Sequence, residues 1–222
     1  MRYISIVIVA LVVLSGVQQV DQTRLLVIGD SLSKGLYATS EVNAYRYLVA
    51  DATRARLGWM LAPTLEVAEE EWADWRWPAD VIIVELGSND LWIGIPEEEW
   101  AERYGAFLDD LQATGARVIV GTITWSGRVE GSESWRRATR YNEYIRAEAG
   151  KRGITVVDLW AVTMGHEEYL SRPDELSPFE PGFEGDGFHP GDLGHRAIAE
   201  AFVGEIRCYR SFWPVFRFVG GE

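Results

Sequence analysis

The sequence predicts a single α/β domain built on a central parallel sheet, and three observations lead to that expectation. Short apolar runs rich in branched residues recur along the chain, at 25–28, 81–84, 118–120 and 154–157. Longer segments with helix-like spacing separate them. Continuous apolar runs are typical of strands buried on both faces, and strands that alternate with helices favour parallel pairing. The 222 residues also suit one domain with a sizeable core.

The N-terminal half is expected to contain three strands and one long helix. The first strand is the run 25–28, which a Gly-Asp pair ends. Apolar residues at helical spacing predict a helix over 41–56. A second strand is expected within 59–67, where Pro63 interrupts the pattern. The run 81–84 predicts the third strand, buried on both faces.

The C-terminal half is expected to contain three helices and two strands. Proline followed by three glutamates is a strong helix start, which predicts a helix over 96–113. The next strand is 118–120, the next helix 134–149, and the last strand 154–157. Residues 191–207 are expected to form the closing helix.

Polar clusters follow three of the expected strands, at 29–31, 87–90 and 122–125. In open parallel sheets, ligands bind beyond the carboxyl ends of the strands. We therefore expect these clusters to converge on one edge of the sheet. The segment 164–186 is rich in acidic residues, glycine and proline, which predicts a long loop over that edge.

The composition excludes some partners. Hydrophobic residues make up 47% of the chain and charged residues 25%, as in ordinary globular proteins. The net charge of −13 and the absence of a basic stripe argue against a nucleic-acid partner. Ten tryptophans are expected in the core or at its rim, or lining a site for a sugar or an acyl chain.

The N-terminus predicts export. Arg2 precedes an apolar run over 4–14 and small residues follow, as in a secretory signal. The run is short for a membrane span, which takes about 20 residues. We expect residues 1–20 to be a signal peptide or an N-terminal membrane anchor, with a buried first strand as the alternative. Residues 21–222 are then one catalytic domain, located outside the cytoplasm.

Ser31 and the block Asp186-Gly187-Phe188-His189 are the candidates for nucleophilic chemistry. Ser31 follows the first strand, where a hydroxyl points out of the sheet edge, although a helix cap or turn residue is the commoner role there. A serine nucleophile needs a base, and the base needs a partner that fixes its tautomer. Across the Gly187 turn, Asp186 can reach Nδ1 of His189 and leave Nε2 for a hydroxyl.

Asn89 follows the most apolar strand, in Gly87-Ser88-Asn89-Asp90. Its side-chain amide could donate to an oxyanion that develops during acyl transfer. Asparagine is also a common turn-forming residue, so both roles stay open at this point.

These three blocks, in this order and spacing, resemble the SGNH (GDSL-type) hydrolase family, from Arg24 to about Phe202. The resemblance implies a three-layer, flavodoxin-like α/β/α fold, an ester-hydrolysing activity and no metal or other cofactor. It implies that Ser31 is the nucleophile, His189 the base and Asp186 its orienting partner. The Ser31 N–H and the Asn89 amide would form the oxyanion hole.

One block departs from the family pattern. The family usually places a glycine after the second strand, and its N–H also faces the oxyanion. No glycine lies between Trp59 and Leu86, and Gly58 comes too early if the strand begins at Trp59. A backbone N–H from residues 64–68 is the expected substitute.

Two other functions remain open from the residues alone. Asp186, His189, Asp192 and His195 are plausible metal ligands, which would suit a metal-dependent hydrolase. A non-catalytic glycan-binding protein could instead use the tryptophans as stacking platforms. We expect an esterase whose substrate is a small-molecule, glycan or lipid ester, since fold and triad do not choose the substrate. The sequence leaves the oligomeric state open.

Overall fold

The computed structural model describes residues 22–172 and 186–210 of the chain. A five-stranded sheet in the order β2-β1-β3-β4-β5 lies at the centre, and every neighbouring pair of strands is parallel. This order is the flavodoxin-like one. The strands are β1 (Arg24–Gly29), β2 (Arg56–Leu61), β3 (Val81–Glu85), β4 (Arg117–Gly121) and β5 (Thr155–Val157).

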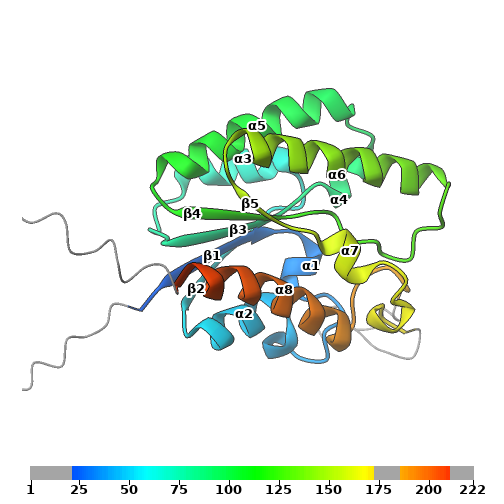
Figure 1. The fold of residues 1–222 in the computed structure, drawn as a ribbon, viewed down its shortest axis with the longest axis horizontal. Coiled ribbons are helices and arrows are strands. Elements are labelled where there is room, and N and C mark those ends of the chain that lie inside the picture. The colour runs from blue at the N-terminus through cyan, green and yellow to red at the C-terminus, as the bar shows by residue number, and fades with distance from the viewer. Residues whose placement is uncertain (1–21, 173–185, 211–222) are drawn as a thin grey trace, which may run out of the picture.

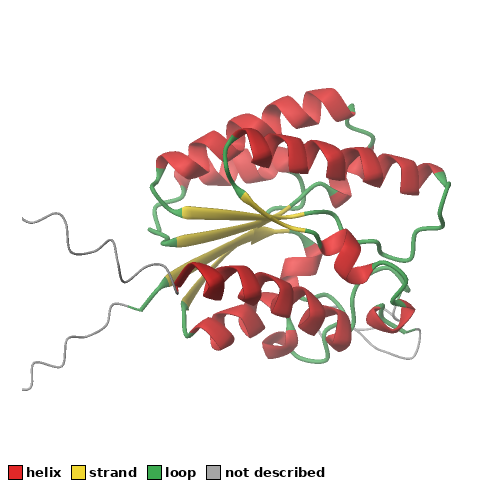
Figure 2. Ribbon diagram, in the orientation of Figure 1, coloured by secondary structure: helices red, strands yellow, loops and turns green. Residues whose placement is uncertain are grey.

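Helices cover both faces of the sheet and make three layers, as the sequence predicted (Figures 1 and 2). One layer holds α3 (Leu65–Asp74), α4 (Ser88–Ile93), α5 (Glu97–Ala113) and α6 (Glu133–Lys151). The opposite side holds α1 (Ser31–Lys34), α2 (Tyr45–Thr53), α7 (Leu159–Thr163) and α8 (Asp192–Arg210). Two short 3₁₀ turns, η1 (Glu41–Asn43) and η2 (Glu167–Tyr169), complete the described elements.

Alternation along each strand divides the core in two. In β1, Leu26 and Ile28 pack with the buried residues of α5 and α6, whereas Leu25 and Val27 pack with those of α2 and α8. All five residues of β3 are buried, which explains its continuous apolar sequence. Burial of apolar area on both faces is the main stabilising contribution to this sheet.

The expected strand at 59–67 was misplaced, because the strand runs from Arg56 to Leu61. Its first residue pairs with Arg24 at the start of β1. Pro63 follows the strand, and the Thr64 hydroxyl then accepts a hydrogen bond from the backbone of Val67 as the N-cap of α3. Capping by Thr64 makes the following residues a helix and not a continuing strand.

The expected helix at 41–56 was too long. Residues 41–43 form η1, Ala44 is extended, and α2 occupies Tyr45–Thr53. The helix ends at Arg54, which adopts a left-handed conformation with φ of 53°. The chain then enters β2, so pairing with β1 overrides the helical pattern of the last residues.

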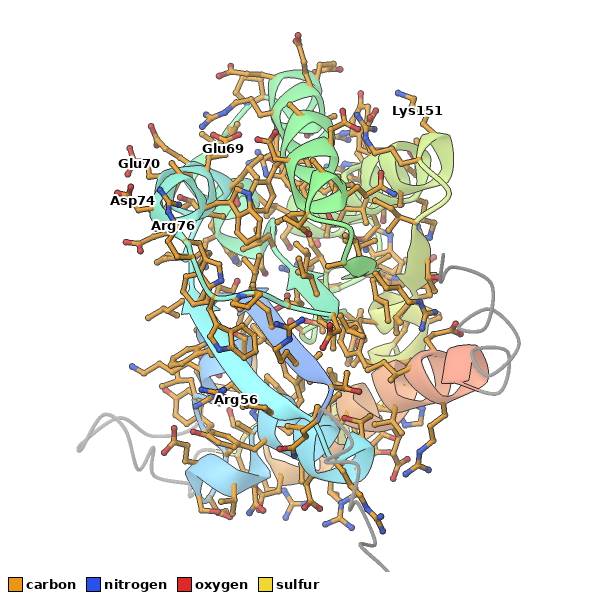
Figure 3. The ribbon with its side chains drawn as sticks, turned by 90° about the vertical axis from the view of Figure 1, so that its left-hand side faces the viewer. Arg56, Glu69, Glu70, Asp74, Arg76 and Lys151 are labelled. Carbon is orange, nitrogen blue, oxygen red and sulfur yellow. The ribbon has the colours of Figure 1, made fainter. Side chains whose placement is uncertain are left out.

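The outer surface of the α3 layer is charged. Figure 3 shows Glu69, Glu70 and Asp74 of α3 near Arg76, at the end of the molecule where β1 begins. Within residues 22–172 and 186–210, no helix is long and apolar enough to cross a membrane. The expected signal or anchor at residues 1–20 lies outside the described residues.

Candidate active site

Ser31 is the first residue of α1, directly beyond the end of β1. Asp30 is the N-cap, and its Oδ1 accepts from the Leu32 N–H at 2.9 Å. The strand can turn into a helix this abruptly because Gly29 has no side chain: a Cβ there would lie 2.9 Å from Cβ of Ser33. As an N-terminal helical residue, Ser31 has a backbone N–H without an intrahelical acceptor.

Ser31, His189 and Asp186 form a continuous hydrogen-bonded chain, although Ser31 lies 158 residues from His189 in the sequence. Ser31 Oγ lies 2.8 Å from Nε2 of His189. Nδ1 of the same ring lies 2.5 Å from Oδ2 of Asp186. A hydroxyl, an imidazole and a carboxylate in this order are the arrangement that activates a serine nucleophile.

The Asp186 carboxylate is held by several donors. Its Oδ1 accepts from the backbone N–H groups of Phe188 and His189, both at 2.9 Å, and from the Ser171 hydroxyl at 3.2 Å. Partial burial works to raise the pKa of Asp186, but the bonds from His189 and Phe188 outweigh it and hold the pKa well below its usual range. The carboxylate is therefore ionised, as an orienting partner for an imidazole requires.

The loop that carries His189 is fastened to the segment after η2. Leu170 and Pro190 form an antiparallel bridge, and the Ser171 N–H donates to the His189 carbonyl at 2.8 Å. Gly187 has a φ of 64°, a left-handed conformation that glycine adopts without strain. The turn seen in the sequence thus places Asp186 and His189 side by side.

Asn89 comes to the same edge of the sheet, on α4 after β3. Its side-chain amide donates to Oδ2 of Asp30 at 3.1 Å and to the Pro63 carbonyl at 2.9 Å. The amide is therefore bound to the residue that precedes the candidate nucleophile. To serve an oxyanion, Asn89 has to redirect one amide hydrogen away from these acceptors.

The fold limits which backbone N–H group after β2 could replace that of the family glycine. Gly58 lies within β2, where a Cβ would come 2.8 Å from the Trp77 ring. It therefore allows close packing of Trp77 on the strand and does not lie at the carboxyl end of β2. The Ala62 N–H donates to the Gly29 carbonyl, and Pro63 has no N–H. The Leu65 N–H donates to the Asp90 carboxylate at 3.1 Å.

In the rest of the 64–68 range, the Val67 and Ala68 amides both donate to Thr64. Three of the five donors that the sequence offered as substitutes for the glycine, at Leu65, Val67 and Ala68, are therefore used by Asp90 and Thr64. The Ser31 N–H, at the first turn of α1, and the Asn89 amide, on α4, remain the two donors that the sequence predicted for an oxyanion.

The four residues considered as metal ligands do not converge. Asp192 is the first residue of α8, and its carboxylate accepts hydrogen bonds from the backbone and hydroxyl of Thr39 and from the amide of Asn43. His195 is fully buried and stacks on Tyr45. Among the described residues, no group of three or more His, Cys, Asp or Glu is placed to share a metal ion.

Sequence reasoning missed several residues around this site. Ser171 supports Asp186, and the buried Glu85 ends β3 close to Asp30. Burial raises the pKa of Asp30 to about 6, and it raises that of Glu85 well above its usual value. The one acidic residue in the run Val81–Glu85 was a usable signal for Glu85, whereas Ser171 carries no local pattern.

A family model for the GDSL-like lipase/acylhydrolase family matches residues 27–197. The chain belongs to this family. It is a serine hydrolase that acts on ester bonds, with the α/β fold of its relatives. Among curated proteins, no relative matches the chain.

Solved structures share the fold of this GDSL-like hydrolase at low sequence identity. A lipolytic G-D-S-L family protein from Veillonella parvula is 16% identical with a TM-score of 0.63, covering 82% of this chain and 97% of its own. Axe2, an acetylxylan esterase from Geobacillus stearothermophilus, is 18% identical with a TM-score of 0.66, covering 83% and 94%. LAE5, a hydrolase from the metagenome of Lake Arreo in Spain, is 20% identical with a TM-score of 0.66, covering 84% and 95%.

Proposed function

We propose that this hydrolase cleaves carboxylic esters through an acyl-enzyme on Ser31, with His189 as general base and Asp186 as its orienting partner. The observation that carries the proposal is the unbroken chain from Ser31 Oγ to Nε2 of His189 and from Nδ1 to Asp186, at 2.8 and 2.5 Å. Family membership supports the reaction class.

In the first step, Nε2 of His189 takes the hydroxyl proton as Ser31 Oγ attacks the ester carbonyl carbon. The imidazolium that forms is stabilised by the ionised Asp186. His189 then gives the proton to the leaving alcohol oxygen as the carbon–oxygen bond breaks. Water repeats the sequence on the acyl-enzyme, which releases the acid and restores Ser31.

The tetrahedral intermediate carries negative charge on the former carbonyl oxygen. Donors fixed before the reaction lower the barrier most, because they need no reorganisation when the charge appears. We assign the Ser31 N–H and the Asn89 amide to this role. The Asn89 amide is bound to Asp30 and Pro63 and redirects one hydrogen to the oxyanion when substrate is present.

The test combines labelling with a panel of esters. A fluorophosphonate should label the native protein on Ser31, and Ser31→Ala should abolish both labelling and turnover with folding unchanged. The panel contains short and long acyl esters and acetylated sugars, the last because Axe2 is an acetylxylan esterase. An adduct on another serine would refute the assignment, and an unlabelled, inactive protein that binds glycans would favour the glycan-binding alternative.

The export signal expected at residues 1–20 supports a location outside the cytoplasm, and we include that location in the proposal. Fractionation of a native host should find the protein in the extracytoplasmic or membrane fraction. A soluble cytoplasmic protein that retains Met1 would contradict it.

A further inference from the structure

A cavity of about 610 Å³ lies beside the triad loop, within the size range of small-molecule sites. Trp125, Trp135, Met164 and Leu170 supply much of its apolar wall. Gly187, between Asp186 and Phe188 on the triad loop, lies in the same wall. The cavity thus shares a boundary with the catalytic chain while Ser31 and His189 lie outside its lining.

Arg128 is the unusual residue in this wall. It is only 4% exposed, and its Nη1 donates to the carbonyls of Thr124 and Trp125 at 2.8 and 3.0 Å. Its Nε and Nη2 are buried and have no hydrogen-bond partner among the described residues. Burying a guanidinium N–H without an acceptor raises the free energy of the folded protein, so a ligand that supplies an acceptor would bind favourably there.

Arg46, a second buried arginine, differs from Arg128 in its partners. Arg46 is 1% exposed and reaches the backbone carbonyls of Ser33 and Lys34, and it also pairs with the Glu41 carboxylate at 2.9 Å. Nε of Arg46 is also without a hydrogen-bond partner in the described part of the chain, but its guanidinium has a carboxylate within the protein. Among the described residues, no carboxylate is paired with Arg128.

The surroundings hold Arg128 in place. The Trp125 indole N–H donates to the Arg128 carbonyl at 2.8 Å, and the turn between them passes through left-handed conformations at Ser126 and Gly127. The guanidinium carbon lies 5.1 Å from the centre of the Phe188 ring. That ring lies 5.3 Å from the His189 ring, so one aromatic side chain separates the cation from the catalytic base.

We propose that Arg128 and this cavity form a subsite for a sugar ring that carries a carboxylate, so that the preferred ester substrates are acylated acidic saccharides. Tryptophan faces are suited to sugar rings, and a guanidinium suits a carboxylate through paired, charge-assisted hydrogen bonds. Because Nε and Nη2 are buried, the ligand carboxylate requires a rotation of the neighbouring Phe188 ring to reach them. Glu130 and Glu167 lie in the same wall and are solvent-exposed, which screens their repulsion. This subsite rests on the proposed hydrolysis at Ser31.

The experiment compares two esters that differ at one position, an O-acetylated methyl glucuronoside and the matching O-acetylated methyl glucoside. Wild-type protein should show a kcat/KM at least about 10-fold higher for the glucuronoside, since a hydrogen bond to a charged group has that order of effect. Arg128→Met should lower kcat/KM for the glucuronoside about 10- to 100-fold, mainly through KM. It should lower kcat/KM for the glucoside by a clearly smaller factor, so that the preference falls, and Arg128→Lys should restore part of the preference.

Arg136→Met is the matched control, because it removes the same charge from an exposed position on α6 outside the cavity lining. It should leave the preference unchanged. Equal activity of wild-type protein on the two esters, or equal losses on both in Arg128→Met, would overturn the subsite.

A binding arm separates this proposal from the proposed function. Titration of Ser31→Ala protein with methyl glucuronoside should give heat that Arg128→Met abolishes, even if no ester is turned over. Free glucuronoside should inhibit wild-type protein competitively. Inhibition that lowers only kcat would assign the cavity to a separate effector and refute its role as a substrate subsite.

Discussion

At the residue scale, the proposed catalytic chain depends on the Asp186 carboxylate, which accepts several hydrogen bonds although it is partly exposed to solvent. The side chain of Asp186 is 35% exposed, yet backbone N–H groups, a serine hydroxyl and the His189 ring all donate to it. Such a carboxylate fixes both the rotamer and the tautomer of the imidazole. Its loss should therefore affect turnover far more than substrate binding.

Asp186→Asn should lower kcat by about 10⁴-fold with little change in KM, because the amide favours the wrong imidazole tautomer and cannot stabilise the imidazolium. Ester turnover and near-ultraviolet circular dichroism measure the loss of rate and the retention of fold. Ser171→Ala is the companion variant, and we expect a loss of less than about 10-fold since it removes one donor among several. Restoration of Asp186→Asn activity by added zinc would contradict the assignment.

Asn89 is the second residue whose replacement should strongly lower turnover, since no glycine amide is available after β2. Asn89→Ala should lower kcat by at least about 10²–10³-fold with KM nearly unchanged. Asn89→Asp should be at least as damaging, because a carboxylate beside Asp30 would repel the oxyanion. The variant kinetics on one aryl acetate test this, and a kcat for Asn89→Ala within a few-fold of wild type would make Asn89 a turn residue only.

At the element scale, the position of the triad loop depends on how closely α8 approaches the segment before the loop. Gly194 lies in the first turn of α8 against the Tyr169 carbonyl and Pro190, and a Cβ at Gly194 would overlap both. The Tyr169 carbonyl also accepts from the Gly191 N–H at 2.9 Å, and Pro190 directly follows His189. The contact between helix and loop therefore helps to set the distance from His189 to Ser31.

Gly194→Ala should destabilise the protein by about 1–3 kcal/mol, the usual effect of overpacking, and should lower kcat by displacing His189. Gly204→Ala on the same helix is the control, because nothing lies within 4 Å of a Cβ there and Gly204 is exposed. It should be neutral or stabilise the fold by about 0.4–1 kcal/mol. Chemical denaturation and ester kinetics on both variants measure the contrast, which equal stability and equal kcat would contradict.

At the scale of the whole molecule, the core between the sheet, α2 and α8 contains a buried imidazole. Burial lowers the pKa of His195 to about 4, against the smaller opposing effects of Leu36 and Asp192. The unfolded chain therefore binds a proton at a higher pH than the folded protein does. His195 contributes no pH dependence above about pH 6.5, and stability falls as the pH decreases from there to about 4.

The loss attributable to His195 over this range should be about 3 kcal/mol, and His195→Phe, which keeps a ring against Tyr45, should remove it. Urea unfolding at pH 7.5 and pH 4.5 provides the measurement. Asp30 and Glu85 have raised pKa values and act in the opposite direction, so the difference between variant and wild type is the informative quantity. An unchanged pH dependence in the variant would refute the role of His195.

The sequence by itself determined the parallel α/β fold, because strands buried on both faces need continuous apolar runs such as residues 81–84. It also predicted Ser31, Asp186, His189 and Asn89 as site residues, since turn residues beyond parallel strands collect at one edge of the sheet. The hydrogen-bonded chain among the first three is what that placement predicts. These features depend on local pattern and on chain order.

Only the tertiary structure decided where β2 ends and which backbone N–H groups after it have protein acceptors. Pairing with β1 ends at Leu61, and Thr64 then caps α3. The same holds for Ser171 and Arg128. The Leu170–Pro190 bridge brings Ser171 within hydrogen-bond distance of Asp186, and Arg128 contacts Phe188 from a loop distant in sequence. Contacts of this kind depend on how elements pack, and no periodicity or spacing along the chain records them.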